Sequence, residues 1–141
     1  MSEQLSRRDR LVSLRRELHR KPEPAWREFW TTARIVEELE DVGVDELHVG
    51  PDAIDAERRM AVPDDEELDA WFERALEAGA DESVLERLRG GNTGVVAVLR
   101  RGEGPTVGLR VDIDALPQRE SDAGEHVPAS EGFRSEHEGP M

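Results

Sequence analysis

A change of sequence pattern near residue 92 constrains the fold most strongly. Before it, apolar residues recur at three- and four-residue intervals among charged residues, as on amphipathic helices. After it come two apolar runs of strand-like pattern, residues 93–99 and 106–115, separated by the turn-forming residues 100–105. The sequence therefore predicts an α/β chain in which N-terminal helices precede a β-hairpin of a central sheet.

Two helices are predicted in the first part of the chain. Leucines at positions 11, 14 and 18 indicate an amphipathic helix that ends near Arg20, because Pro22 and Pro24 cannot continue it. Apolar residues from Trp26 to position 39 indicate a second helix, for which Gly43 is a plausible stop. The aromatic residues of this second helix are expected in the core.

A short strand is expected at residues 44–49, and two more helices should follow it. Acidic residues just after Pro63 suit the first turn of a helix that ends at Gly79. Asp81 can cap a short helix that closes before the two glycines at 90 and 91. Their buried stripes should consist of residues 68, 71, 72, 75 and 76 in the first and residues 84, 85 and 88 in the second.

The chain is acidic and poor in core material. Of its 141 residues, 36% are hydrophobic, and 33 Asp and Glu against 19 Lys and Arg give a net charge of −14. Such a surface disfavours nucleic acid and anionic membranes as partners, and it also suits a protein adapted to high salt. The lack of cysteine excludes disulfides and thiolate metal sites within the chain. With no secretory signal pattern and no long apolar run, the cytoplasm is the expected location.

The run at 106–115 carries the chemistry that the sequence suggests. Its odd-numbered residues from 107 to 113 are branched and apolar, whereas Arg110, Asp112 and Asp114 share the other face. Alternate residues on a strand lie about 6.5–7 Å apart, so the two carboxylates suit metal binding or the orientation of a metal-ligating histidine. The alternative is a solvated strand of alternating charges, in which Arg110 pairs with an aspartate.

Other kinds of site find little support. None of the four histidines, at positions 19, 48, 126 and 137, forms a tight His-x-x-x-His pair. A surface or structural role is expected for His19, and no role is assigned to His126 or His137. The glycines at 90–94 lack the lysine and the spacing of a phosphate-binding loop.

Three segments together resemble metal-dependent amidohydrolases of the aminoacylase and carboxypeptidase G type. Residues 14–23 look like the opening helix of that family, and residues 91–97 look like its first core strand. Residues 109–117, Leu-Arg-Val-Asp-Ile-Asp-Ala-Leu-Pro, are similar to the family signature Leu-Arg-Ala-Asp-Met-Asp-Ala-Leu-Pro. An insertion beginning at residues 58–64 resembles that of the p-aminobenzoyl-glutamate hydrolase subgroup.

The resemblance implies a fold and an activity. Residues 1–141 would be the N-terminal part of a zinc-exopeptidase-type catalytic domain, with a lid or dimerisation domain later in the chain. Two divalent ions, zinc or manganese, would activate water for hydrolysis of the amide bond of a small N-acyl or N-aroyl amino acid, with a glutamate as general base. Asp114 would orient the metal centre from outside its ligand shell, Asp112 would lie beside it in the catalytic site, and Arg110 would be structural.

The metal-ligand run of the family, His-Ala-Cys-Gly-His-Asp, would follow directly after Met141. We therefore expect the intact parent to be the enzyme, acting as a homo- or hetero-oligomer. The 141 residues alone should be inactive and hold no stoichiometric metal, because two aspartates are too few ligands. The alternative is a non-catalytic acidic protein, such as a partner of a full-length relative.

Overall fold

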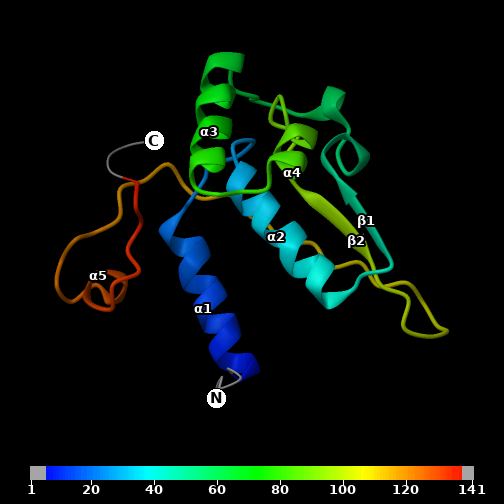
Figure 1. Ribbon diagram of the computed structural model, residues 1–141, viewed down its shortest axis with the longest axis horizontal. Helices are drawn as coiled ribbons and strands as arrows, with labels where there is room; N and C mark the ends of the chain where they lie inside the picture. Colours follow the sequence, from blue (N-terminus) through cyan, green and yellow to red (C-terminus); the bar gives the residue numbers. More distant parts are fainter. Residues whose placement is uncertain (1–5, 138–141) are drawn as a thin grey trace. The chain divides into compact units, whose positions relative to one another are not determined.

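The computed structural model of the protein describes residues 6–137, which form two compact units (Figure 1). Unit 1 combines residues up to Pro22 with those from Leu116 onward, and unit 2 comprises residues 23–115. The expected continuation into a ligand motif after Met141 concerns residues outside the described part. No helix among residues 6–137 is long and apolar enough to cross a lipid bilayer.

Unit 1 contains α1 (Arg7–Arg20) and the single-turn α5 (Val127–Ser130). The hydroxyl of Ser6 accepts a hydrogen bond from the N–H of Asp9, 3.2 Å away, and so caps the start of α1. The helix ends just before Pro22, as predicted. The returning segment is anchored to that end of α1, because the N–H of Glu136 donates to the carbonyl of Arg20 at 2.8 Å.

Unit 2 contains the other predicted helices, α2 (Phe29–Val42), α3 (Asp65–Glu77) and α4 (Glu82–Arg87), and two short 3-10 helices at Gly50–Asp52 and Ala56–Arg58. Gly43 ends α2 in the left-handed region with φ 79°, which suits a residue without a Cβ. Asp64 and Asp81 cap the starts of α3 and α4 through their carboxylates. These stops and caps confirm the predicted boundaries to within a few residues.

The helices of unit 2 pack with one small sheet around a shared core. Strands β1 (Glu46–Val49) and β2 (Val95–Val98) are antiparallel, with Glu46 opposite Val98 and Val49 opposite Val95. The rings of Phe29 and Phe72 meet edge to face, 5.8 Å apart, between α2 and α3. The core holds most of the side chains expected there: Phe29, Trp30, Ala33, Val36, Leu68, Trp71, Phe72, Ala75, Val84, Leu85 and Leu88.

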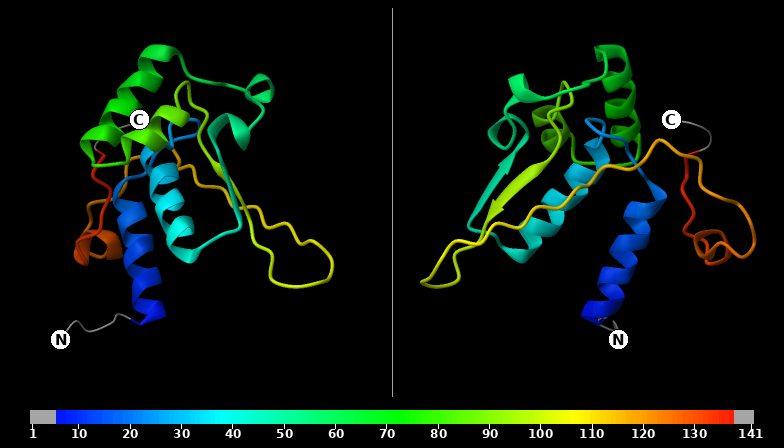
Figure 2. Two further views of the ribbon diagram at one scale, coloured as in Figure 1. Left: turned by 45° about the vertical axis from the view of Figure 1, so that its right-hand side comes forward. Right: turned by 180° about the vertical axis from the view of Figure 1, so that it is seen from behind.

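The predicted hairpin is wrong. Within the described residues, 106–115 form no strand, and β2 pairs instead with β1. The chain leaves β2 in a long loop and returns without joining the sheet (Figure 2). Val107 and Leu109 are 85% and 89% exposed, and β2 itself is only partly covered. An alternating pattern shows which residues suit a strand, but it does not specify the partner strand.

Candidate functional site

Asp112 is a surface residue. Its Oδ1 lies 3.0 Å from Nη2 of Arg110, and both side chains are mostly exposed. This is the arrangement that the sequence offered as the alternative, a solvated run of alternating charges in which Arg110 pairs with an aspartate. The contact leaves Asp112 without a buried or preorganised setting of the kind that catalytic carboxylates use.

Asp114 is also exposed, but its chain segment is fixed to the start of α2. The N–H of Ala115, the next residue, donates to the carbonyl oxygen of Glu23 at 2.8 Å. The charge of Asp114 acts on the buried carboxyl of Glu28. The structure therefore gives the two aspartates of the signature different surroundings, because Asp112 meets an arginine and Asp114 faces a carboxyl at a helix end.

Glu23 closes the N-terminal end of α2. Its side chain is buried, and its two carboxylate oxygens accept hydrogen bonds from the N–H groups of Trp30 at 3.0 Å and Thr31 at 2.7 Å. These groups belong to the first turn of α2, where N–H groups lack partners within the helix. Burial raises the pKa of Glu23 to about 7, although hydrogen bonds from Thr31 and Trp30 oppose the shift.

Glu28 is the second buried carboxyl at this helix end. The hydroxyl of Thr93, which is itself buried, lies 2.5 Å from Oε2 of Glu28. Nearby, the N–H of Gly94 donates to the hydroxyl of Thr32 at 3.1 Å, so the chain entering β2 is held to α2 twice. Burial raises the pKa of Glu28, the hydrogen bond from Thr93 opposes the rise, and the charge of Asp114 adds to it.

The sequence did not single out these two glutamates. Glu23 appeared only as the last residue of the opening motif, and Glu28 was passed over in the pattern of the second helix. One signal was available, since a glutamate set among Pro22, Pro24 and Trp26 at a helix start is in apolar surroundings. Burial of Glu28, however, depends on Thr93, which lies 65 residues later.

Unit 1 holds a separate cluster that spacing did not predict. Oε1 of Glu120 lies 2.6 Å from Nε2 of His19 and 2.8 Å from Nε2 of His126. The ring of Phe133 meets that of His19 edge to face at 5.5 Å, and the guanidinium of Arg16 lies over the same phenyl ring. Both histidines converge on one oxygen, so the cluster is an internal hydrogen-bond network rather than an open ligand set.

The described residues do not match the donor set that a zinc or manganese ion needs. Within residues 6–137, no group of three or more His, Asp or Glu side chains is arranged to hold a metal ion. Asp112 is engaged by Arg110, and Asp114 faces Glu28, which supplies one further carboxyl. We therefore derive no reaction step through a metal from these residues.

No family model matches the chain. Known proteins nevertheless match nearly all of it. Indole-3-acetyl-aspartic acid hydrolase of Enterobacter agglomerans is 45% identical over 132 residues, which are 93% of this chain and 30% of that protein. A p-aminobenzoyl-glutamate hydrolase subunit of Escherichia coli is 38% identical over 133 residues, and its homolog in Haemophilus influenzae is 40% identical over 138 residues.

A solved structure shares the fold. The crystal structure of the aminobenzoyl-glutamate utilization protein from Klebsiella pneumoniae superposes with a TM-score of 0.72 at 44% identity, covering 76% of this chain and 27% of that one. The chain spans about 30% of the length of the curated relatives that it matches. Over almost all of its own length, the chain is thus homologous to hydrolases named for indole-3-acetyl-aspartic acid and p-aminobenzoyl-glutamate.

Proposed function

We propose that the chain forms part of an enzyme that hydrolyses the amide bond of N-acyl or N-aroyl amino acids. The similarity to the named hydrolases over 93% of the chain carries this proposal. Indole-3-acetyl-aspartate and p-aminobenzoyl-glutamate are the substrates to test first, because the names of the relatives contain them. Both join an aromatic carboxylic acid to an acidic amino acid, so the proposed substrate class has one acyl group and one amino-acid group.

The proposed enzyme has a zinc-exopeptidase-type catalytic domain that uses zinc or manganese. Support comes from the likeness of residues 109–117 to the amidohydrolase signature. Within this chain, Asp114 is the proposed orienting residue, because its segment is fixed to the start of α2 through Ala115 and Glu23. Asp112 contributes less, since Arg110 already engages its carboxylate at the surface.

We also propose that the complete enzyme is oligomeric. Two of the relatives are named as one subunit of a hydrolase or as the homolog of that subunit, a name that marks one chain among several. The same comparison favours a small-molecule substrate.

A hybrid enzyme tests the proposed activity. The 132 matching residues of the Enterobacter indole-3-acetyl-aspartic acid hydrolase would be replaced by their counterparts from this chain, which are 45% identical. The hybrid should release aspartate from indole-3-acetyl-aspartate or glutamate from p-aminobenzoyl-glutamate. Asp114→Asn should lower kcat/KM about 10- to 100-fold, the usual effect of losing a group that orients a metal ligand.

Asp122→Asn is the control, because Asp122 is an exposed aspartate of unit 1 that pairs with Arg119 at 3.5 Å. It should leave kcat/KM unchanged. A hybrid that is folded by circular dichroism and monodisperse, yet releases no amino acid from either compound, would contradict the proposal. Equal losses in the Asp114 and Asp122 variants would remove the role of Asp114 but keep the activity.

The isolated 141-residue chain gives a second test. After dialysis we expect less than one zinc or manganese ion per chain by elemental analysis, because residues 6–137 offer no group of three ligands. Retention of one or more ions per chain would show that these residues build a metal site of their own.

A further inference from the structure

The two carboxyl groups of Glu28 and Asp114 reach the same end of α2 from different directions. Glu28 is the residue that precedes the first turn of the helix, and its carboxylate is buried against the hydroxyl of Thr93 at 2.5 Å. Asp114 arrives from the loop that follows β2 and is fixed there by the hydrogen bond between Ala115 and Glu23. One group is therefore buried and immobile, and its neighbour is open to solvent.

Like charges at this distance are coupled. Each negative charge disfavours the other, so the pair is more stable with fewer than two charges than with both. Burial acts on Glu28 alone, since Asp114 is exposed. The buried partner therefore takes up the proton, and the exposed partner is left as the charged acceptor for an incoming donor.

We infer that Glu28 is the positioning residue of Asp114, a buried proton-holding partner that the signature segment meets at the start of α2. This role rests on the proposed function, in which Asp114 is the orienting carboxylate of the hydrolase. Besides Asp114, Glu23 is the titratable group that acts on Glu28, and the donors around Glu28 are the hydroxyl of Thr93 and backbone N–H groups at residues 26 and 28. A cation or donor that binds Asp114 would relieve the repulsion and release the proton from Glu28.

Titration of Glu28 in the full 141-residue chain tests the inference without substrate or metal. The chain would be labelled with 13C at the glutamate side-chain carboxyl, and the Glu28 signal assigned by its loss in Glu28→Gln. Asp114→Asn should lower the pKa of Glu28 by at least about 0.3 unit, because a neighbouring negative charge is removed. Asp112→Asn is the matched control, since it removes an exposed charge two residues away that Arg110 already pairs.

A second pair of variants guards against a change of fold. Asp114→Glu and Asp114→Gln have similar volume and differ in charge, so only the Gln variant should lower the pKa of Glu28, with tryptophan fluorescence confirming that both retain the core. A Glu28 pKa that is equal in the two variants, or equally lowered by Asp112→Asn, would overturn the inference. Because no catalysis is measured, this result is independent of whether the hybrid enzyme hydrolyses its substrates.

Discussion

The imidazole Nε2 of His19 lies 2.6 Å from Oε1 of Glu120, although the two residues are 101 positions apart in the sequence. His126 reaches the same oxygen at 2.8 Å, and the other oxygen of Glu120 accepts the N–H of Ser135 at 2.5 Å. One carboxylate therefore joins α1 to the returning segment of unit 1. Its charge is a main source of order in a unit that contains few buried apolar side chains.

Unit 1 should lose stability in acid. Burial alone would raise the pKa of Glu120, but hydrogen bonds from Ser135, His126 and His19 lower it from 4.5 to about 2. Because the folded pKa is depressed, the stabilisation is complete above about pH 4.5 and is lost as the pH falls towards 2. The amide NMR signals of Ser135 and Glu136 should collapse towards unfolded positions over this range.

The variant Glu120→Gln should lose that acid transition and destabilise unit 1 at pH 7 by about 1.5–3 kcal/mol, the cost of hydrogen bonds to a charged group. Hydrogen exchange at the N–H of Glu136, which donates to Arg20, measures the loss. Glu125→Gln, an exposed neighbour, should behave as the wild type. Equal protection in the two variants would show that Glu120 does not hold this unit together.

The sequence predicted local structure far better than the contacts between distant segments. Gly43, Asp64 and Asp81 end or begin helices for reasons that lie within a few residues, so the helix boundaries were predictable. The partner of β2 was not, because β1 lies about 50 residues earlier and offers no distinctive pattern. The surroundings of Asp114 were unpredictable for the same reason, since they depend on Glu23 and Glu28, far away in the chain.

Glu23 gives unit 2 the opposite pH dependence from Glu120. Its folded pKa is raised from 4.5 to about 7, so the protonated form is favoured in the fold. Stability is complete below about pH 4.5 and is lost as the pH rises through 7, by up to about 3 kcal/mol. Urea unfolding followed by tryptophan fluorescence should show the midpoint falling between pH 5 and pH 8.

Glu23→Gln should flatten that slope, because the amide keeps a hydrogen-bond acceptor for the start of α2 and has no charge to bury. Glu67→Gln is the control, since Glu67 is more exposed and its carboxylate pairs with Arg27 at 2.8 Å. A slope that survives unchanged in Glu23→Gln would show that another group is responsible.

The segment at 106–116 should make the isolated chain associate. Val107, Leu109, Val111 and Leu116 are at least 74% exposed, although their alternation is typical of a strand covered on one side. An apolar segment without a strand partner is a template for pairing with other chains. Sedimentation velocity should show oligomers that grow with concentration, and Leu109→Lys with Val111→Lys should reduce them.

The matched control for association is Val12→Lys, which adds one charge at an exposed apolar position in unit 1. It should leave the oligomers of the 106–116 segment unchanged. A wild-type chain that sediments as a monomer and melts in one sharp transition would contradict the prediction.

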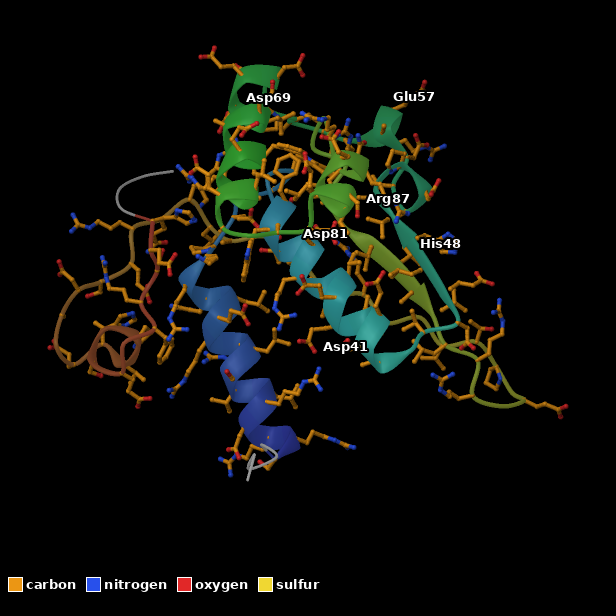
Figure 3. The ribbon with its side chains drawn as sticks, viewed as in Figure 1. Asp41, His48, Glu57, Asp69, Asp81 and Arg87 are labelled. Carbon is orange, nitrogen blue, oxygen red and sulfur yellow. The ribbon has the colours of Figure 1, made fainter. Side chains whose placement is uncertain are left out.

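Added salt should stabilise the chain. The net charge is −14, and acidic side chains such as Asp41, Glu57 and Asp69 come from different elements and are exposed at the surface of unit 2 (Figure 3). Their mutual repulsion is screened as the Debye length falls from about 10 Å at 0.1 M salt to about 3 Å at 1 M. The urea midpoint should therefore rise between 0.1 M and 1 M KCl.

A variant with fewer exposed charges separates screening from general effects of salt on apolar burial. Glu57→Gln, Glu66→Gln and Glu77→Gln together remove three exposed negative charges without touching the core. At 0.1 M KCl this variant should be more stable than the wild type, and its midpoint should rise less on going to 1 M. If both proteins gain equally, the acidic surface contributes no repulsion that salt relieves, and an adaptation to high salt has no basis in the charge of this chain.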